Sequence, residues 1–154
     1  MTEKLKLKIP PPIIAILSAL IIWGLSETLP TDVINGEIRQ IIALIILAMA
    51  GAIDAWALIS FRMVKTTIDP RYPHKTSTIV SHGIYAYTRN PMYLGLVLIL
   101  SSLSIYLGTA FGLIVMVLFI LYMNRFQIVA EEEALERQFG EAYLDYKNSV
   151  RRWI

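Results

Sequence analysis

The sequence predicts an all-α membrane protein with about four transmembrane helices, a long cytoplasmic loop and a C-terminal helical tail. Apolar residues make up 56% of the chain and charged residues only 17%, whereas a soluble domain carries roughly 25% charge. The apolar residues also fall in blocks that approach the length of about 20 residues needed to cross a bilayer. The 154 residues are expected to form a single domain over positions 1–154.

The first two spans are expected at residues 13–29 and 38–61. The first follows Pro10-Pro11-Pro12, which suits a helix N-terminus because an N–H at that position has no helical partner to lose. We interpret it as a retained span and not as a cleaved signal, since no small-residue cleavage site stands out. Asp54 in the second span costs roughly 3 kcal/mol in a bilayer unless it is paired or hydrated, so it should face the bundle interior or an interface. The neighbouring Gly51-Ala52 pair is expected to permit close helix packing.

The last two spans are expected at residues 91–107 and 110–128, with a tight turn at Gly108-Thr109 between them. The helical pattern of the fourth span continues beyond the membrane into the tail, residues 129–154. Gly140 is typical of the residue that ends a helix, and a further short helix follows it.

Basic residues are concentrated in the N-terminal segment, in the loop over residues 65–90 and in the C-terminal tail. The opposite loops contribute essentially only Arg39. Because cytoplasmic loops are enriched in lysine and arginine, both termini and the long loop are expected in the cytoplasm. An even number of spans is consistent with this orientation.

The composition excludes several kinds of site. The chain has no cysteine, which excludes disulfides, thiolate metal ligands and cysteine nucleophiles. Two histidines are few for a histidine-based metal site, and we expect no metal. His74 and His82 lie in the long loop and receive no role. A net charge of +2 gives no indication of a nucleic-acid partner.

Two polar segments hold the residues best suited to chemistry, one at residues 77–95 and one at residues 131–152. The first enters the third span at Pro91, and the free N–H groups of a helix N-terminus can hold an anion. Tyr85 and two further tyrosines lie beside it, but interfacial tyrosines are common, and spacing alone favours an ordinary helix start. The second segment places Glu131 and neighbouring acidic residues at the cytoplasmic end of the fourth helix. Composition leaves open whether they form a solvated face or bind a cationic or hydroxyl-rich ligand.

Together, the two segments resemble the isoprenylcysteine carboxyl methyltransferase-like family, a branch of the membrane methyltransferases that also includes phospholipid N-methyltransferases. The stretch from Gly83 to Gly95, with Arg89-Asn90-Pro91-Met92-Tyr93-Leu94-Gly95, is similar to the first family signature. The stretch from Glu131-Glu132 through Phe139-Gly140, Tyr143 and Tyr146 is similar to the second. Two ordered signatures at matching separation are more specific than either alone, and the resemblance covers roughly the C-terminal 95 residues.

The resemblance implies an enzyme that transfers a methyl group from S-adenosylmethionine at the cytoplasmic membrane face. Carried over position by position, the implied cofactor-binding residues are Ser77, Thr78, Ile79, Val80, Tyr85, Asn90, Pro91, Met92, Tyr93 and Glu131. Tyrosine faces attract a sulfonium cation, and a carboxylate such as that of Glu131 can accept hydrogen bonds from an ammonium group or ribose hydroxyls. Thr66-Thr67 and Asp69-Pro70 also fit the bacterial members, which suggests the inner membrane of a prokaryote.

At the positions that meet the substrate in the family, this chain differs more from the family pattern than at the cofactor-binding positions. The eukaryotic prenylcysteine enzymes have histidine where this chain has Ser77 and Asn90, and arginine where it has Gln127. Arg89, Arg125 and Gln127 are the candidates for positioning the substrate, and no catalytic residue is assigned. The expected partners are membrane lipids and a lipophilic acceptor that carries a carboxylate, an amine or a thiol.

Two other functions remain open at this point. Sterol reductases share a similar C-terminal signature and use a nicotinamide cofactor, although they are larger and have more spans. A small multispan module without enzymatic activity would need a polar path through the membrane. Only Asp54 and a few serines within the spans offer such a path.

Overall fold

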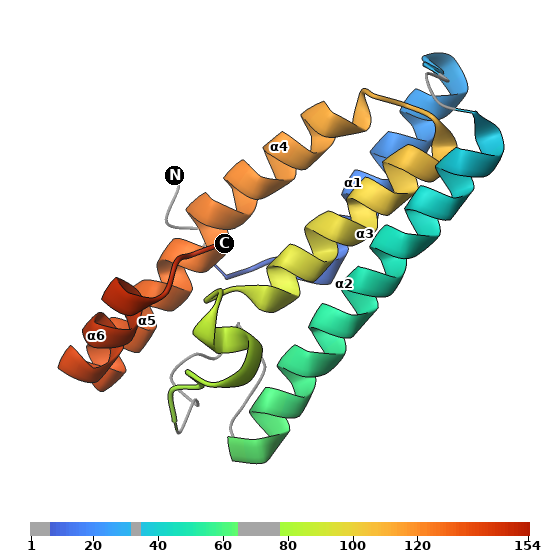
Figure 1. Ribbon diagram of the computed structural model, residues 1–154. Helices are drawn as coiled ribbons and strands as arrows, with labels where there is room; N and C mark the ends of the chain where they lie inside the picture. Colours follow the sequence, from blue (N-terminus) through green and yellow to red (C-terminus); the bar gives the residue numbers. More distant parts are fainter. Residues whose placement is uncertain (1–6, 32–34, 65–77) are drawn as a thin grey trace.

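The computed structural model describes residues 7–31, 35–64 and 78–154, and these ranges contain helices and connecting segments without a strand (Figure 1). The long helices begin and end close to the expected spans. In chain order, the elements are α1 (Pro11–Thr28), α2 (Gly36–Val64), the 3₁₀-helix η3 (Gly83–Ala86), α3 (Pro91–Leu107), α4 (Gly112–Tyr122), the π-helix η4 (Met123–Ile128), α5 (Val129–Phe139) and α6 (Glu141–Ser149).

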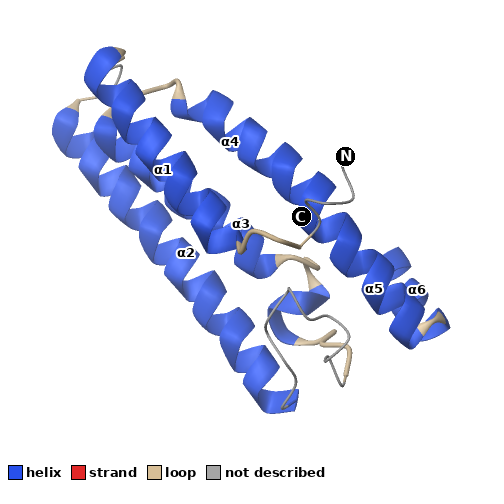
Figure 2. Ribbon diagram, turned by 180° about the vertical axis from the view of Figure 1, so that it is seen from behind, coloured by secondary structure: helices blue, strands red, loops and turns tan. Residues whose placement is uncertain are grey.

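The central element is α3, which packs against α1, α2 and α4. Figures 1 and 2 show α1, α2 and α3 side by side, while α4 leads away into α5 and α6. On the side of α3 that faces α1 and α4, the buried core contains Ile22, Leu100, Phe119 and Met123. These large side chains fill the bundle interior from α1, α3, α4 and η4.

The contact between α2 and α3 depends on small residues. Ala43, Ala50 and Ala57 are spaced seven residues apart and are at most 2% exposed, so they lie on one helix face and let the backbones approach closely. The Ser102 hydroxyl of α3 donates to the Ala43 carbonyl oxygen at 2.7 Å. The expectation that Gly51-Ala52 forms this contact is wrong, because a Cβ at Gly51 would meet nothing within 4 Å.

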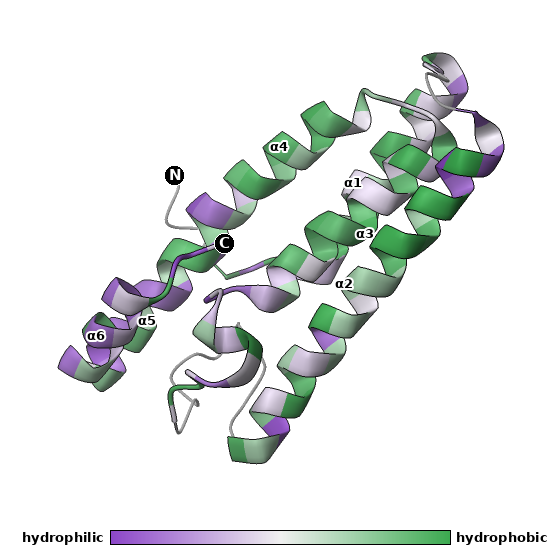
Figure 3. Cartoon of the chain, in the orientation of Figure 1, coloured by the Kyte–Doolittle hydropathy of each residue, from purple (hydrophilic) through white to green (hydrophobic). Residues whose placement is uncertain are grey.

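The outer surfaces of α1, α2 and α4 are apolar. Leu20, Leu44 and Leu118, for example, are each more than half exposed, and a lipid bilayer would cover such a surface. Three continuous helices, Pro11–Thr28, Gly36–Val64 and Gly112–Phe139, contain segments long and apolar enough to cross a membrane, and α3 is a shorter apolar helix. Figure 3 shows the polar residues gathered in α5 and α6, beyond the apolar part. The protein is therefore an all-helical multi-pass membrane protein with about four spans.

The fourth span is not the uninterrupted α-helix that the sequence indicated. It changes to a π-helix at η4 before α5 continues in nearly the same direction (Figure 2). The N-terminal segment contacts this π-helix, because the Leu7 N–H donates to the Phe126 carbonyl oxygen at 3.1 Å. The buried Gln127 side chain donates to the Ile9 carbonyl oxygen at 2.6 Å. π-Helical segments are frequent at functional sites.

The C-terminal segment returns to the same π-helix. Gly140, with a φ of +54°, ends α5 as expected and lets α6 fold back along it. The Trp153 indole N–H then donates to Asn124 Oδ1 at 3.1 Å. Both described ends of the chain consequently lie at the same end of the helix bundle, as an even number of spans requires.

Candidate active site

The two segments that carry the family signatures meet in space. The Tyr93 hydroxyl, in the first turn of α3, donates a hydrogen bond to a Glu131 carboxylate oxygen in the first turn of α5, although 38 residues separate them in the chain. Tyr93 is buried beside the bundle core. This contact joins the entrance of the third span to the tail of the fourth.

Tyr85 is held beside this contact by α2 and α6. Its buried ring meets the Phe61 ring edge-on, with centroids 5.2 Å apart, and its backbone carbonyl accepts a hydrogen bond from the Tyr146 hydroxyl at 2.8 Å. Gly83 allows η3 to pack this closely against α2, because its φ is +62° and a Cβ there would lie 2.6 Å from Ser60 Oγ. A side chain at position 83 would push η3 away from α2.

The charges of two carboxylates act on the Tyr85 phenol. Burial raises the pKa of Tyr85, and the nearby phenol of Tyr146 and the negative charges of Glu131 and Asp54 raise it further. The carboxylates of Glu131 and Asp54 come from different helices, α5 and α2, and both lie close enough to influence the same phenol. The surroundings of Tyr85 therefore favour positive charge.

The N-terminus of α3 presents N–H groups without a side-chain cap. Pro91 occupies its first position, and Asn90 makes no capping hydrogen bond. Instead, the Asn90 amide donates to the Arg152 carbonyl oxygen at 2.9 Å. The first N–H groups of a helix have no helical partner, so those of Met92 and Tyr93 can receive an anionic group such as a carboxylate.

Glu131 is a carboxylate without a cation among the described side chains within ion-pair distance. Burial raises its pKa to about 7; the hydrogen bond from Tyr93 opposes this shift and the charge of Glu132 adds to it. A carboxylate in this state titrates near neutral pH. It can accept hydrogen bonds from a bound ligand and would gain from a positive charge brought by that ligand.

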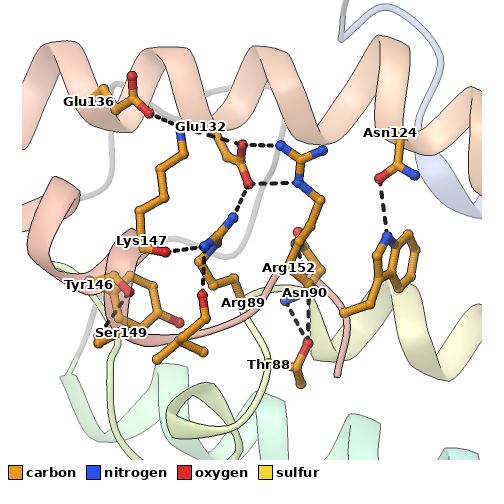
Figure 4. A network of polar contacts seen from close by, with 12 residues as sticks. Thr88, Arg89, Asn90, Asn124, Glu132, Glu136, Tyr146, Lys147, Ser149 and Arg152 are labelled. Carbon is orange, nitrogen blue, oxygen red and sulfur yellow. Dashed lines mark hydrogen bonds and ion pairs between the residues drawn. The ribbon is translucent and has the colours of Figure 1, made fainter.

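Glu132 is the centre of an ionic cluster that also contains Arg89, Arg152 and Lys147 (Figure 4). The Arg89 guanidinium lies 2.9 Å from Glu132 Oε1, and that of Arg152 lies 2.6 Å from Oε2. Lys147 Nζ is 3.9 Å from Oε2. Burial alone would raise the pKa of Glu132, but the hydrogen bonds and positive charges of Arg152 and Arg89 outweigh it and hold the pKa below its ordinary value.

The ionic cluster connects three parts of the chain. Arg89 Nη1 donates to the carbonyl oxygens of Lys147 and Val150, and the Arg89 N–H donates to the Arg151 carbonyl oxygen at 3.0 Å. The segment before α3 is thereby fastened to α5 and to the segment after α6. The ionic cluster holds in place the two helix starts that bring Tyr93 and Glu131 together.

Comparison with known proteins decides which family this fold and site belong to. The family model of the phospholipid methyltransferases matches residues 38–142, more than half of the chain. The chain belongs to the phospholipid methyltransferase family. This membership implies methyl transfer to a lipid-related acceptor at a membrane, and it favours methyl transfer over the reductase and the non-enzymatic alternatives.

The chain is also similar to an uncharacterized protein of Haemophilus influenzae. The two are 46% identical over 63 residues, which is the whole of that protein and 41% of this chain. No solved structure matches the chain.

The structure brings some of the predicted cofactor-binding residues of this methyltransferase family member together. Tyr85, Tyr93 and Glu131 lie in one place, with Asn90, Pro91 and Met92 at the start of α3 beside them. Val80 and Met92 pack with Tyr85 against α2, Ile79 is half-buried and Thr78 is exposed. Ser77 lies outside the described residues, as do Thr66-Thr67, Asp69-Pro70 and His74. Their cofactor contacts stay predictions.

The three candidates for substrate positioning lie in different surroundings. Arg89 belongs to the ionic cluster around Glu132. Gln127 is fully buried and holds the N-terminal segment through Ile9. Arg125 is exposed on the π-helix. Their roles toward a substrate stay predictions, and the structure gives Arg89 and Gln127 contacts that hold the fold together.

Sequence reasoning missed the roles of Arg152, Tyr146 and Gly95. Arg152 completes the pairing of Glu132, and Tyr146 supports Tyr85. Gly95 leaves room for Asp54, since a Cβ at this position would collide with the Asp54 carboxylate. The sequence indicated that Asp54 is unusual, but it carries no signal that Asp54 lies against Gly95 of α3. Across the described ranges, no cluster of three potential metal ligands occurs.

Proposed function

We propose that this protein transfers a methyl group from S-adenosylmethionine to a lipophilic carboxylate, amine or thiol at the cytoplasmic face of the membrane. The observation that carries the proposal is the hydrogen bond from Tyr93 to Glu131. It unites the two signature segments into one site at the polar end of the bundle. Neither segment could form such a site alone.

The chemistry of the residues at this site fits S-adenosylmethionine as the methyl donor. The uncapped N-terminus of α3 suits the carboxylate of the methionyl group. The Glu131 carboxylate suits its ammonium group or the ribose hydroxyls, which would bring a positive charge or hydrogen-bond donors in addition to the Tyr93 hydroxyl. The aromatic rings of Tyr85 and Tyr93 suit a sulfonium, an attraction of roughly 0.5–2 kcal/mol. When bound, the cofactor supplies an already activated methyl group.

The residues of the chain itself then serve mainly to bind, orient and exclude water. Tyr85 and Tyr93 are buried, and a dry, fixed site places a nucleophile in line with a methyl carbon at small entropic cost. The acceptor would reach the site from the lipid side, between helices. The polar cofactor would enter from the cytoplasm, where the positive-inside rule places both termini. The meeting of both described chain ends at η4 supports termini on a single side.

Binding of S-adenosylhomocysteine tests the cofactor assignment. Isothermal titration of the full-length protein in detergent should show saturable binding, and Glu131→Gln should weaken it by about tenfold or more, because a hydrogen bond to a charged group contributes roughly 1.5–3 kcal/mol. Asp145→Asn is the matched control, since Asp145 is an exposed carboxylate on α6. Absence of binding by well-folded protein would remove the cofactor from the proposal. Equal affinities of the wild type and Glu131→Gln would remove Glu131 from the site.

A further inference from the structure

Asp54 lies on the face of α2 that packs against α3. It follows the buried Ala50 by four residues and precedes the buried Ala57 by three, which places all three on one side of the helix. Gly95 of α3 lies against the Asp54 side chain, because a Cβ added at Gly95 would collide with the carboxylate. The acidic group is thus inserted between two helices, and a glycine provides the space.

One oxygen of the Asp54 carboxylate lacks a hydrogen-bond donor. Its Oδ1 atom is buried and has no hydrogen-bond partner among the described residues. Buried polar atoms are nearly always paired, and an exception calls for an explanation such as a catalytic role or an absent partner. An ionisable residue within a membrane span that lacks a partner is by default a candidate functional residue.

The position of Asp54 suits the head group of a membrane-bound molecule. Gly95 is four residues after Pro91, the first residue of α3, so at a rise of 1.5 Å per residue Asp54 lies about 6 Å inside the cytoplasmic end of that helix. Asp54 thus lies about one turn of α3 from the polar segment that precedes Pro91. Ile53, the neighbour of Asp54 on α2, packs with Tyr85, and the charge of Asp54 acts on the Tyr85 phenol, so Asp54 borders the proposed cofactor site.

The charges around the site favour one kind of head group. The Arg89 guanidinium, which could meet an anionic acceptor, already pairs with Glu132 and donates to two backbone carbonyl oxygens. The negative charges of Asp54 and Glu131 both act on Tyr85. An acceptor carboxylate at Asp54 would meet like charge, whereas an N–H or O–H donor would satisfy Oδ1.

On the basis of the proposed function, we infer that Asp54 is the specificity-determining residue of the acceptor site. It accepts a hydrogen bond from an acceptor head group that bears an ammonium or a hydroxyl, and it disfavours carboxylate acceptors. Gly95 is the positioning residue that gives the Asp54 side chain its place. The lipophilic acceptors are then those that carry a hydrogen-bond donor.

Equilibrium binding of three probes of equal chain length tests this inference. The probes are radiolabelled dodecylamine, dodecanol and dodecanoate, and each is titrated onto the full-length protein in phosphatidylcholine nanodiscs. The titrations are made with and without S-adenosylhomocysteine, and binding to empty nanodiscs is subtracted. Dodecylamine or dodecanol should bind at least about tenfold more tightly than dodecanoate. In Asp54→Asn, which keeps the shape and removes the charge, the preference for dodecylamine over dodecanoate should fall to about threefold or less.

Two glycine variants provide a matched pair. Gly95→Ala should reduce the head-group preference as Asp54→Asn does, because the new Cβ displaces the Asp54 carboxylate. Gly51→Ala, on the same helix as Asp54 but facing open space, should bind the probes as the wild type does. If Gly95→Ala does not fold, Asp54→Asn still decides the question.

The possible outcomes separate this inference from the proposed function. Equal binding of the three probes, or tighter binding of dodecanoate, overturns the role of Asp54. An Asp54→Asn protein that keeps the wild-type preference for dodecylamine over dodecanoate overturns it as well. If S-adenosylhomocysteine does not bind but the head-group preference depends on Asp54, the role of Asp54 holds and the proposed cofactor fails. If Asp54→Asn weakens S-adenosylhomocysteine binding and leaves the probe preference intact, Asp54 belongs to the cofactor site and the inference is wrong.

Discussion

Glu131 and Glu132 are neighbours at the start of α5, but they belong to two different regions of the molecule. Glu132 lies in the ionic cluster, where arginines from the segment before α3 and from the C-terminal end hold its pKa low. Glu131 faces Tyr93 in the candidate active site, and its pKa is raised to about 7, chiefly by burial. In the ionic cluster the Glu132 carboxylate is paired with cations and stabilises the fold, whereas Glu131 has no cation within ion-pair distance among the described side chains. Four substitutions or conditions distinguish these two regions.

Glu132→Ala should have the largest effect, and it should act on stability. The variant leaves the buried Arg89 guanidinium without its anionic partner, and breaking a buried pair in this way costs about 3–5 kcal/mol. Thermal unfolding of the detergent-solubilised protein should show a clear fall in Tm, while Asp145→Ala, at an exposed position of α6, should leave Tm unchanged. An unaltered Tm in Glu132→Ala would mean that the ionic cluster does not hold α5 and the C-terminal end in place.

The pH dependence of ligand binding should separate Glu131 from Glu132. The pKa of Glu131 is about 7, so its carboxyl is mostly protonated at pH 6 and mostly ionised at pH 8. The ionised form is the one that accepts from an ammonium or hydroxyl group, and affinity for S-adenosylhomocysteine should therefore rise by about tenfold between pH 6 and pH 8. Isothermal titration across this range measures the change, and Glu131→Gln should be flat. A wild-type affinity that falls with rising pH would contradict the assigned state of Glu131.

Tyr146→Phe should have a smaller effect on both regions. It removes the hydrogen bond to the Tyr85 carbonyl oxygen, which contributes roughly 0.5–1.5 kcal/mol. We expect a modest decrease in the free energy of unfolding together with weaker S-adenosylhomocysteine binding, because η3 positions Tyr85. A decrease in stability with unchanged binding would show that Tyr85 does not contact the cofactor.

Lys147→Ala should have the smallest effect. Lys147 pairs with Glu136 and lies 3.9 Å from Glu132, but one third of its side chain is exposed. Partly exposed ion pairs contribute about 0–1 kcal/mol. Denaturation should show a change within this range and S-adenosylhomocysteine binding should not change. A loss as large as that of Glu132→Ala would show that the ionic cluster depends on Lys147 as much as on its arginines.

The sequence predicted the elements of the fold well where the signal is local. Helix α3 runs over Pro91–Leu107, the residues at which the sequence places the third span, and Gly108 and Gly140 end their helices with positive φ values of 70° and 54°. The π-helix at η4 was not predicted, because no residue type favours it clearly. Its contacts with Leu7, Gln127 and Trp153 depend on how distant segments pack.

By itself, the sequence determined that this protein is a helical membrane protein, because the length of an apolar segment and the position of a turn glycine are properties of neighbouring residues. It also indicated which two segments resemble the family signatures. Only the tertiary structure decided that Glu132 pairs with arginines while Glu131 accepts a hydrogen bond from Tyr93, and that Asp54 lies against Gly95. Two adjacent glutamates on one helix point in different directions. Their partners come from distant parts of the chain, so only the packing of the helices sets their charge states and roles.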